Sequence, residues 1–159
     1  MPLQRMTLRD FVIVEALEID FESGFTALTG ETGAGKSILI DALQMILGAR
    51  ADAGLVREGA ARADLSAEFV PPADVQSWLS EGGFDAGGEL LLRRTVDTTG
   101  KSRGWINGIP ATATQLRELG AVLLDIHGQH AWQKLMQSGA VRALLDAYAD
   151  ADTQAVQTN

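Results

Sequence analysis

The chain has 159 residues, no cysteine and a formal net charge of −8. This length suits one domain that can bury a real core, and the missing cysteines exclude disulfides and thiolate metal sites. The acidic balance makes the chain as a whole a poor generic nucleic-acid binder, because such binding depends on neutralising phosphates with Lys and Arg. Since no apolar run could span a membrane and residues 1–21 lack a signal-peptide core, we expect no membrane contact and a cytoplasmic location.

Three strands are predicted before residue 30. Residues 3–10 and 12–21 form the first two, because residues 16–21 alternate between apolar and polar side chains with the period of a half-buried strand. A turn at residues 22–24 then leads into a short, apolar, β-prone segment at residues 25–29. The sequence therefore predicts a meander whose last strand leads into a glycine-rich stretch.

That stretch, Gly30-Glu31-Thr32-Gly33-Ala34-Gly35-Lys36-Ser37, has the P-loop or Walker A pattern G-x-x-x-x-G-K-[ST]. The glycines let the backbone approach a phosphate closely, and successive N–H groups can bind an anion. Lys36 can reach the β- and γ-phosphates of ATP, and the Ser37 hydroxyl can ligate Mg²⁺. The alternative is a glycine-rich turn that binds nothing. It is disfavoured by the strand before the motif and by the helix predicted at residues 38–47, which should be largely buried and end at Gly48.

The remaining elements mix strands with short helices. We predict strands at residues 62–70, 89–96, 102–106 and 121–126, and helices at residues 72–79, 115–119 and 138–148. The turns between them are predicted at Gly82-Gly83, at residues 98–101 and at Asn107-Gly108, and Gly120 is expected to end the helix that Thr112 or Thr114 caps. Residues 150–159 are a polar tail without a core pattern.

A group of basic residues has two interpretations. It comprises Arg57, Arg62, Arg93, Arg94, Lys101 and Arg103. A hairpin carrying the last four could touch a DNA backbone, and Trp105 beside them could stack on a base. An ordinary charged strand face with a packed Trp is favoured in an acidic chain. Arg57, after the predicted P-loop helix, could meet nucleotide or a partner.

Two histidines and an aspartate around residue 127 could be considered as metal ligands or catalytic groups. His127 and His130 are a weak zinc signal without cysteine or an acid cluster, so we expect them to shape their loop. Asp125 ends an apolar strand as a Walker B acid does, but no Glu follows it.

Four segments together resemble the RecN family of bacterial DNA-repair ATPases, which belongs with the SMC-like ABC ATPases. They are MTLRDFVIVEALEIDF, GETGAGKSILIDAL, RGWINGIP and LLDIHGQHAWQKLM, and DIHGQH is the most discriminating part. The resemblance implies an α/β fold, the lobe of a P-loop ABC-type ATPase head, with a mixed sheet around the P-loop strand–helix unit and an antiparallel side sheet. Residues 1–150 would be the N-terminal lobe, and residues 151–159 a tail leading toward a coiled coil that is absent here.

The resemblance also implies roles for individual residues. The triphosphate of ATP would be held by Gly30, Glu31, Thr32, Gly33, Ala34, Gly35, Lys36 and Ser37. Gln129 matches the Q-loop glutamine, which reaches Mg²⁺ or the attacking water. Lys36 and Gln129 would therefore act in catalysis, and Ser37 and Gln129 would ligate the metal ion. An amide oxygen can ligate a hard cation, although without the resemblance a solvated loop glutamine is favoured. The strand before Gln129 would lie at the Q-loop, which removes the Walker B role from Asp125.

The partners implied are the C-terminal half of the same head, a second head in an ATP-bridged dimer, and DNA through the full protein, at the bacterial nucleoid. The function implied is double-strand-break repair and recombination. The chain contains neither a Leu-Ser-Gly-Gly signature nor a strand ending in Asp-Glu. By itself it is therefore expected to bind ATP weakly and to hydrolyse it very slowly or not at all. The alternatives are a non-hydrolytic nucleotide-binding or assembly module and, less favoured, a small P-loop kinase.

Overall fold

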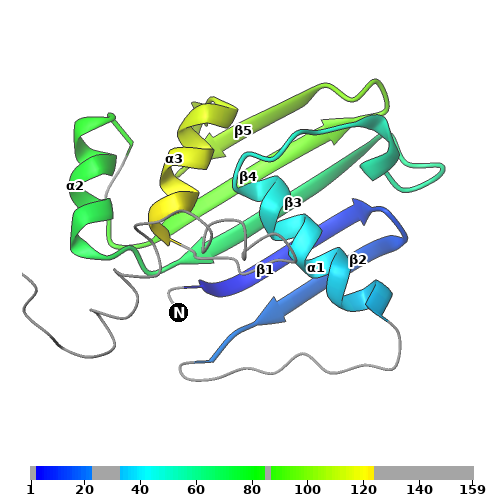
Figure 1. The fold of residues 1–159 in the computed structure, drawn as a ribbon, viewed down its shortest axis with the longest axis horizontal. Coiled ribbons are helices and arrows are strands. Elements are labelled where there is room, and N and C mark those ends of the chain that lie inside the picture. Colours follow the sequence, from blue (N-terminus) through cyan, green and yellow to red (C-terminus); the bar gives the residue numbers. More distant parts are fainter. Residues whose placement is uncertain (1–2, 23–32, 85–86, 124–159) are drawn as a thin grey trace, which may run out of the picture. The chain divides into compact units, whose positions relative to one another are not determined.

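The computed structural model describes residues 3–22, 33–84 and 87–123. The strands in these ranges form one six-stranded antiparallel sheet with the order β2-β1-β3-β4-β5-β6 (Figure 1). The strands are β1 (Leu3–Phe11), β2 (Val14–Asp20), β3 (Arg62–Phe69), β4 (Leu90–Asp97), β5 (Ser102–Ile106) and β6 (Ile109–Ala111). The helices are α1 (Gly33–Ile46), α2 (Ala73–Glu81) and α3 (Ala113–Leu123), with a 3-10 turn, η1, at Ala53–Leu55.

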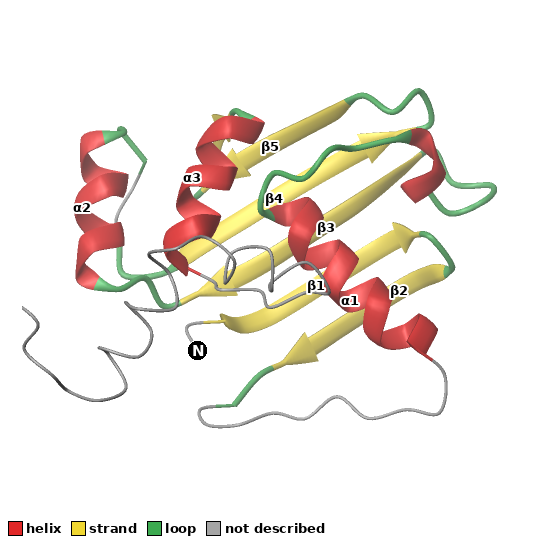
Figure 2. Cartoon of the chain, viewed as in Figure 1, coloured by secondary structure: helices red, strands yellow, loops and turns green. Residues whose placement is uncertain are grey.

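The described helices lie on one side of this sheet (Figure 2). Helix α1 packs on β3 and β4, and α3 packs on β5 and α2. The sheet therefore has an inner face toward the helices and an outer face that no described helix covers.

The core lies between the inner face and the helices. The predicted alternation of β3 is confirmed, because Ala63, Leu65, Ala67 and Phe69 are all fully buried. Across the β3–β4 register, Leu65 lies opposite Arg94 and Ala67 opposite Leu92. Directly opposed residues share a face, so Arg94 points into the core with the apolar residues of β3.

Most predicted strands are confirmed within a residue or two of their ends. These are β1, β2, β3, β4 and β5, whereas β6 was not predicted. The segment expected at residues 25–29 lies outside the described residues, as do the helix at 138–148 and the tail from residue 150.

The prediction for residues 121–126 is wrong where it can be compared, because residues 121–123 belong to α3. Gly120 was expected to end a short helix, but it lies inside α3, where it packs against Leu47, the residue directly after α1. A Cβ on Gly120 would come within 3.0 Å of the Leu47 Cβ. The glycine therefore allows close packing rather than ending the helix, and residues 124–126 lie outside the described residues.

The predicted turns and caps are confirmed by their backbone geometry. Asn107 and Gly108 both have positive φ, 48° and 80°, as a two-residue type I′ hairpin requires. Thr112 forms a capping box with Gln115: the Gln115 amide donates to the Thr112 hydroxyl at 3.1 Å, and the Thr112 amide donates to the Gln115 side-chain oxygen at 2.9 Å. Pro72 and Gly82 flank α2.

Candidate functional site

Helix α1 begins inside the glycine-rich motif, at Gly33. Gly30, Glu31 and Thr32 lie outside the described residues, whereas Gly33–Ser37 form the first turns of the helix. The first four N–H groups of a helix lack partners within the helix, and its dipole makes this end partly positive. The first turn carries no acidic residue, and a helix N-terminus is a general binding site for anions such as phosphate.

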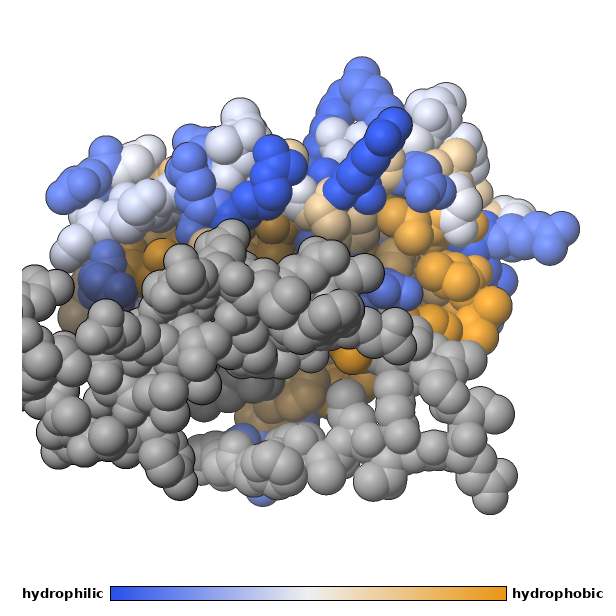
Figure 3. Space-filling view, viewed as in Figure 1, coloured by the Kyte–Doolittle hydropathy of each residue, from blue (hydrophilic) through white to orange (hydrophobic). Residues whose placement is uncertain are grey.

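Among residues 38–46 of α1, the buried side chains lie toward the C-terminal end of the helix. Ala42, Met45 and Ile46 are almost fully buried, but Ile40 is 44% exposed. The expectation that the helix is largely buried is therefore wrong for Ile40. Figure 3 views this side of the molecule and shows hydrophobic surface between the hydrophilic residues.

The C-terminal end of α1 is held by a buried arginine of β4. Arg94 is only 3% exposed, and its Nη1 donates to the carbonyl oxygens of Met45 at 2.8 Å and Ala49 at 2.6 Å. Its Nη2 donates to the Ser102 hydroxyl at 3.0 Å. A cation at a helix C-terminus also interacts favourably with the negative end of the helix dipole, so Arg94 fixes the end of α1 opposite the motif.

A second arginine, from α3, reaches the same place. Arg117 Nη1 donates to the Gly48 carbonyl at 3.1 Å, and Nη2 donates to the Thr114 hydroxyl at 3.1 Å. Burial, and to a smaller extent the charge of Arg117, lower the pKa of Arg94 from its ordinary value. Gly48, with a φ of 92°, ends the helix as predicted, because the Ala49 amide donates back to the Gln44 carbonyl at 3.0 Å.

The loop after α1 is fixed to the end of β1. Arg57 Nε donates to Asp10 Oδ1 at 2.8 Å, and the Arg57 amide donates to the Asp10 carbonyl at 2.9 Å. Phe11 also forms a β-bridge with Val56. Both charged side chains of the pair remain 35% exposed, so the Arg57 head group keeps a water-accessible side.

The basic residues of the sequence divide between the two faces of the sheet. On the outer face an open concavity of about 420 Å³ is lined by Arg62, Arg93, Thr95, Asp97, Lys101, Arg103 and Trp105. The hypothesis that Arg94 belongs to this basic surface is wrong, because neighbouring residues of a strand point to opposite faces and Arg94 is the inward one.

One cation of the concavity is already neutralised. Arg93 donates to both carboxylate oxygens of Asp64, at 2.9 and 2.5 Å. The hydrogen bond to Asp64 is the main reason that the pKa of Arg93 is raised. Its guanidinium carbon also lies 5.1 Å from the centre of the Trp105 ring, a cation–π contact. Trp105 therefore packs against Arg93 on the outer face.

Several expected site residues lie outside the described residues, namely Asp125, His127, Gln129 and His130. Within residues 3–22, 33–84 and 87–123, no group of three His, Asp or Glu side chains is placed to hold a metal ion. None of the helices in these ranges is long and apolar enough to cross a membrane.

Three polar side chains around α1 were not assigned these roles by sequence reasoning: Asp10, Arg94 and Arg117. Two-residue periodicity could have placed Arg94 on the inner face, since it lies two residues from the buried Leu92 and Val96 on either side. No local pattern pointed to Asp10 or Arg117, because their contacts join segments 47 and 69 residues apart.

Comparisons with known proteins identify relatives of nearly the whole chain. The AAA domain family matches residues 5–77. The DNA repair protein RecN of Xylella fastidiosa is 46% identical over 156 residues, which cover 96% of this chain and 28% of that protein. RecN of Bacillus subtilis is 43% identical over 155 residues, covering 96% of this chain and 27% of that protein. The chain thus spans little more than a quarter of the length of these relatives.

The fold also matches a solved structure from work on the ATP-driven dimerisation and DNA-stimulated activation of SMC ATPases. The TM-score is 0.66 at 25% identity, over 92% of this chain and 98% of that chain. The predicted fold class, an α/β lobe of a P-loop ABC-type ATPase head, is confirmed by this match.

Proposed function

The chain is RecN-like over nearly its whole length and matches the N-terminal part of those proteins, and from this premise we propose that it is the ATP-binding N-terminal lobe of a DNA-repair ATPase head. The observation that carries the proposal is the motif at residues 30–37, whose last five residues open α1. A phosphate cradle needs that order: glycines, then helix amides. The proposed work of the full protein is repair and recombination at DNA double-strand breaks.

The proposed roles follow from the chemistry of each group. Backbone amides of residues 30–36 bind the triphosphate, and the Lys36 ammonium contacts the β- and γ-phosphates. Ser37 and Gln129 offer oxygen ligands to Mg²⁺, and Gln129 also orients water. Bound Mg²⁺ neutralises charge on the phosphates.

The remaining catalytic groups are proposed to come from other parts of an assembly. A signature motif and Walker B acids would be supplied by the C-terminal half of the same head, and a second head would close over the nucleotides. Support comes from the SMC match, since the matched work concerns ATP-driven dimerisation. ATP-driven closing and reopening of heads would then be coupled to DNA tethering by the full protein in the bacterial cytoplasm, at the nucleoid.

Replacing Lys36 by Ala tests the phosphate cradle. Lys36→Ala removes the only side-chain cation of the motif, so we expect ATP–Mg²⁺ affinity to fall at least roughly tenfold, the equivalent of about 1.4 kcal/mol. The measurement is titration of a fluorescent ATP analogue. Lys101→Ala is the matched control, because Lys101 lies in the β4–β5 turn, on the outer-face concavity, and should leave the affinity unchanged.

ATP turnover tests whether this lobe hydrolyses ATP only when it is assembled with the other parts of the head. Full-length protein, or this chain mixed with the C-terminal head segment, should hydrolyse ATP, and Lys36→Ala should abolish that activity. Equal turnover in the two proteins would contradict the proposal. A nucleotide-induced rise in unfolding temperature that survives Lys36→Ala, without turnover in any mixture, would favour a non-hydrolytic binding or assembly module instead.

A further inference from the structure

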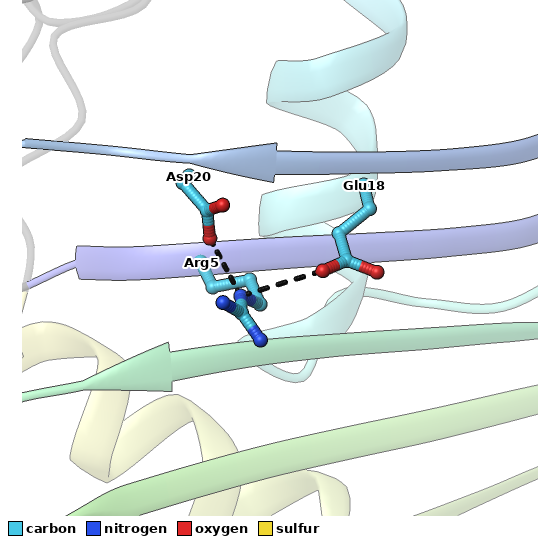
Figure 4. A network of polar contacts seen from close by, with 3 residues as sticks. All are labelled: Arg5, Glu18 and Asp20. Atoms are coloured by element: carbon cyan, nitrogen blue, oxygen red, sulfur yellow. Dashed lines mark hydrogen bonds and ion pairs between the residues drawn. The ribbon is translucent and has the colours of Figure 1, made fainter.

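Charge is segregated along the outer face of the sheet. At the β1–β2 end, Arg5 lies between acids: its Nε is 2.6 Å from Asp20 Oδ1 and 3.6 Å from Glu18 Oε1 (Figure 4). The hydrogen bond to Asp20 first, and the charges of Asp20, Glu18 and Glu68 next, raise the pKa of Arg5. Arg5 is thus surrounded by carboxylates, and a bound polyanion would be repelled beside it.

The β3–β5 end has the opposite balance. Its concavity is lined by four cations, Arg62, Arg93, Lys101 and Arg103, and by the carboxylate of Asp97, while Asp64 beside it pairs with Arg93. Asp97 is itself occupied, because it accepts hydrogen bonds from the Thr99 amide and hydroxyl and from the Lys101 amide. Within the described part of the chain, the side chains of Arg62 and Arg103 form neither a hydrogen bond nor an ion pair.

The register shows how these cations are spaced. Arg62 on β3 lies opposite Asp97, and Arg103 on β5 lies opposite Thr95, two residues earlier on β4. Adjacent strands are about 4.8 Å apart and residues on one face of a strand repeat about every 6.7 Å. The basic side chains therefore form a band across three neighbouring strands rather than one point-like pocket.

The environment of Trp105 argues for contacts to a phosphate backbone rather than to bases. Its ring lies under the Arg93 guanidinium at 5.1 Å, and it lies opposite Pro110 on β6. The Arg93 guanidinium covers one ring face, so a base could stack only on the other. Phosphate oxygens, in contrast, can bind Arg and Lys without any stacking.

We propose that this basic concavity is a sequence-independent contact site for the phosphodiester backbone of duplex DNA. A band of cations matches DNA, which presents one negative charge per about 1.7 Å of helix axis, better than it matches a compact anion. The choice of DNA as the occupant rests on the proposed function in DNA repair, whereas the polyanion site rests on the charges alone. The acidic β1–β2 end limits the bound backbone to the other half of the face.

The test compares full-length wild type with an Arg62→Gln/Lys101→Gln/Arg103→Gln variant, using a labelled DNA duplex of mixed sequence. Each lost phosphate contact lowers the slope of log Kobs against log salt by about 0.9, so three lost contacts lower it by about 2.7. We expect that change, together with at least roughly tenfold weaker binding at moderate salt. Thermal unfolding and ATP affinity should stay at wild-type values, because these side chains lie on the face opposite α1.

A charge-matched control removes two cations away from the concavity. Arg5→Gln/Arg50→Gln leaves the concavity intact, so its salt slope should match wild type, whereas Arg62→Gln/Arg103→Gln removes the same charge from the concavity and should lower the slope by about 1.8. A second variant acts in the opposite direction. Asp64→Asn takes away the carboxylate bound by Arg93 and should tighten duplex binding several-fold.

Several results would overturn the proposal. Unchanged binding and slope in the triple variant would do so, as would an equal loss in the charge-matched control. Equal competition by sodium triphosphate, at matched ionic strength, would indicate a site for a compact free anion, and competition by polyglutamate alone would indicate an acidic protein partner. None of these results depends on Lys36, so a failure here is distinct from a failure of the ATP site.

Discussion

At the residue scale, the most informative pair is Arg93 and Arg94. They are neighbours on β4, yet one lies half-buried on the charged outer face and the other is buried beneath the end of α1. Two identical side chains thus have different physical roles. Arg93 is a partly exposed surface cation that pairs with Asp64, and Arg94 is a buried donor to main-chain carbonyls.

Replacement of Arg94 should be costly. Arg94→Met removes three hydrogen bonds and leaves the Met45 and Ala49 carbonyls without this donor. Leaving a buried acceptor without its donor costs about 1–3 kcal/mol, so the two carbonyls together should lower the free energy of unfolding by about 2–6 kcal/mol. Urea unfolding is the measurement. Arg94→Lys should be more stable than Arg94→Met but less stable than wild type, because an ammonium lacks the planar fork of donors.

Arg93→Met is the matched control for that experiment. Its ion pair with Asp64 is partly exposed, with side-chain exposures of 42% and 26%, and such pairs are worth about 0–1 kcal/mol. A loss of stability at Arg93 equal to that at Arg94 would contradict the distinction between the two faces.

At the element scale, the β4–β5 hairpin shows how one side chain shapes a turn. Asp97 accepts hydrogen bonds from the Thr99 hydroxyl at 2.6 Å and from the amides of Thr99 and Lys101 at 2.9 and 3.0 Å. The Thr99 hydrogen bond is the largest cause of the lowered pKa of Asp97. The ionised carboxylate therefore stabilises the folded hairpin.

This lowered pKa predicts a pH dependence. A carboxyl with a lower pKa in the folded state stabilises the fold above its unfolded pKa, about 3.9, and that contribution disappears as the pH falls through the folded value. Asp97→Asn should therefore be less stable than wild type at neutral pH, and the difference should shrink on acidification below about pH 4. Urea midpoints across this range check it. A difference that stays constant with pH would contradict the role of the charge, and Thr99→Ala should reproduce part of the effect.

The elements also show where sequence reasoning succeeds. Short-range signals were reliable: Asn107-Gly108 predicted its hairpin and Gly48 the end of α1, and of the two predicted capping residues, Thr112 and Thr114, the first caps α3. Gly120 was misread, because a glycine that ends a helix and one that admits a packed neighbour look alike in sequence. Only the contact with Leu47, from a segment far away in the chain, distinguishes them.

At the scale of the whole molecule, the sheet divides into a helix-covered face and a charged face. A matched pair of leucines tests this division. Leu65 on β3 is fully buried on the inner face, whereas Leu91 on β4 is 39% exposed. Leu65→Ala should lower the free energy of unfolding by about 2–5 kcal/mol, because it leaves a cavity, and Leu91→Ala by less than about 1 kcal/mol. Equal losses in urea unfolding would contradict this assignment of faces.

The same division explains how much of the site could be predicted. The phosphate motif and the strand that buries Ala63 and Leu65 follow from local spacing, so both were evident in the sequence. The joining of all described strands into one sheet was not, since β1 pairs with β3 across the whole of α1. The basic concavity likewise needs three strands in register, and only the fold supplies that. The role of Gln129 stays a prediction.

The opposed directions of Arg93 and Arg94 also have a consequence for how this chain can vary. A single-residue insertion within β4 would shift the register by one and exchange the two faces. The buried arginine would then point to solvent, and Arg93 or a neighbour would be driven among Leu65 and Ala67. Gains and losses of length are therefore expected at residues 98–101, where the turn can absorb them, and not within Leu90–Asp97.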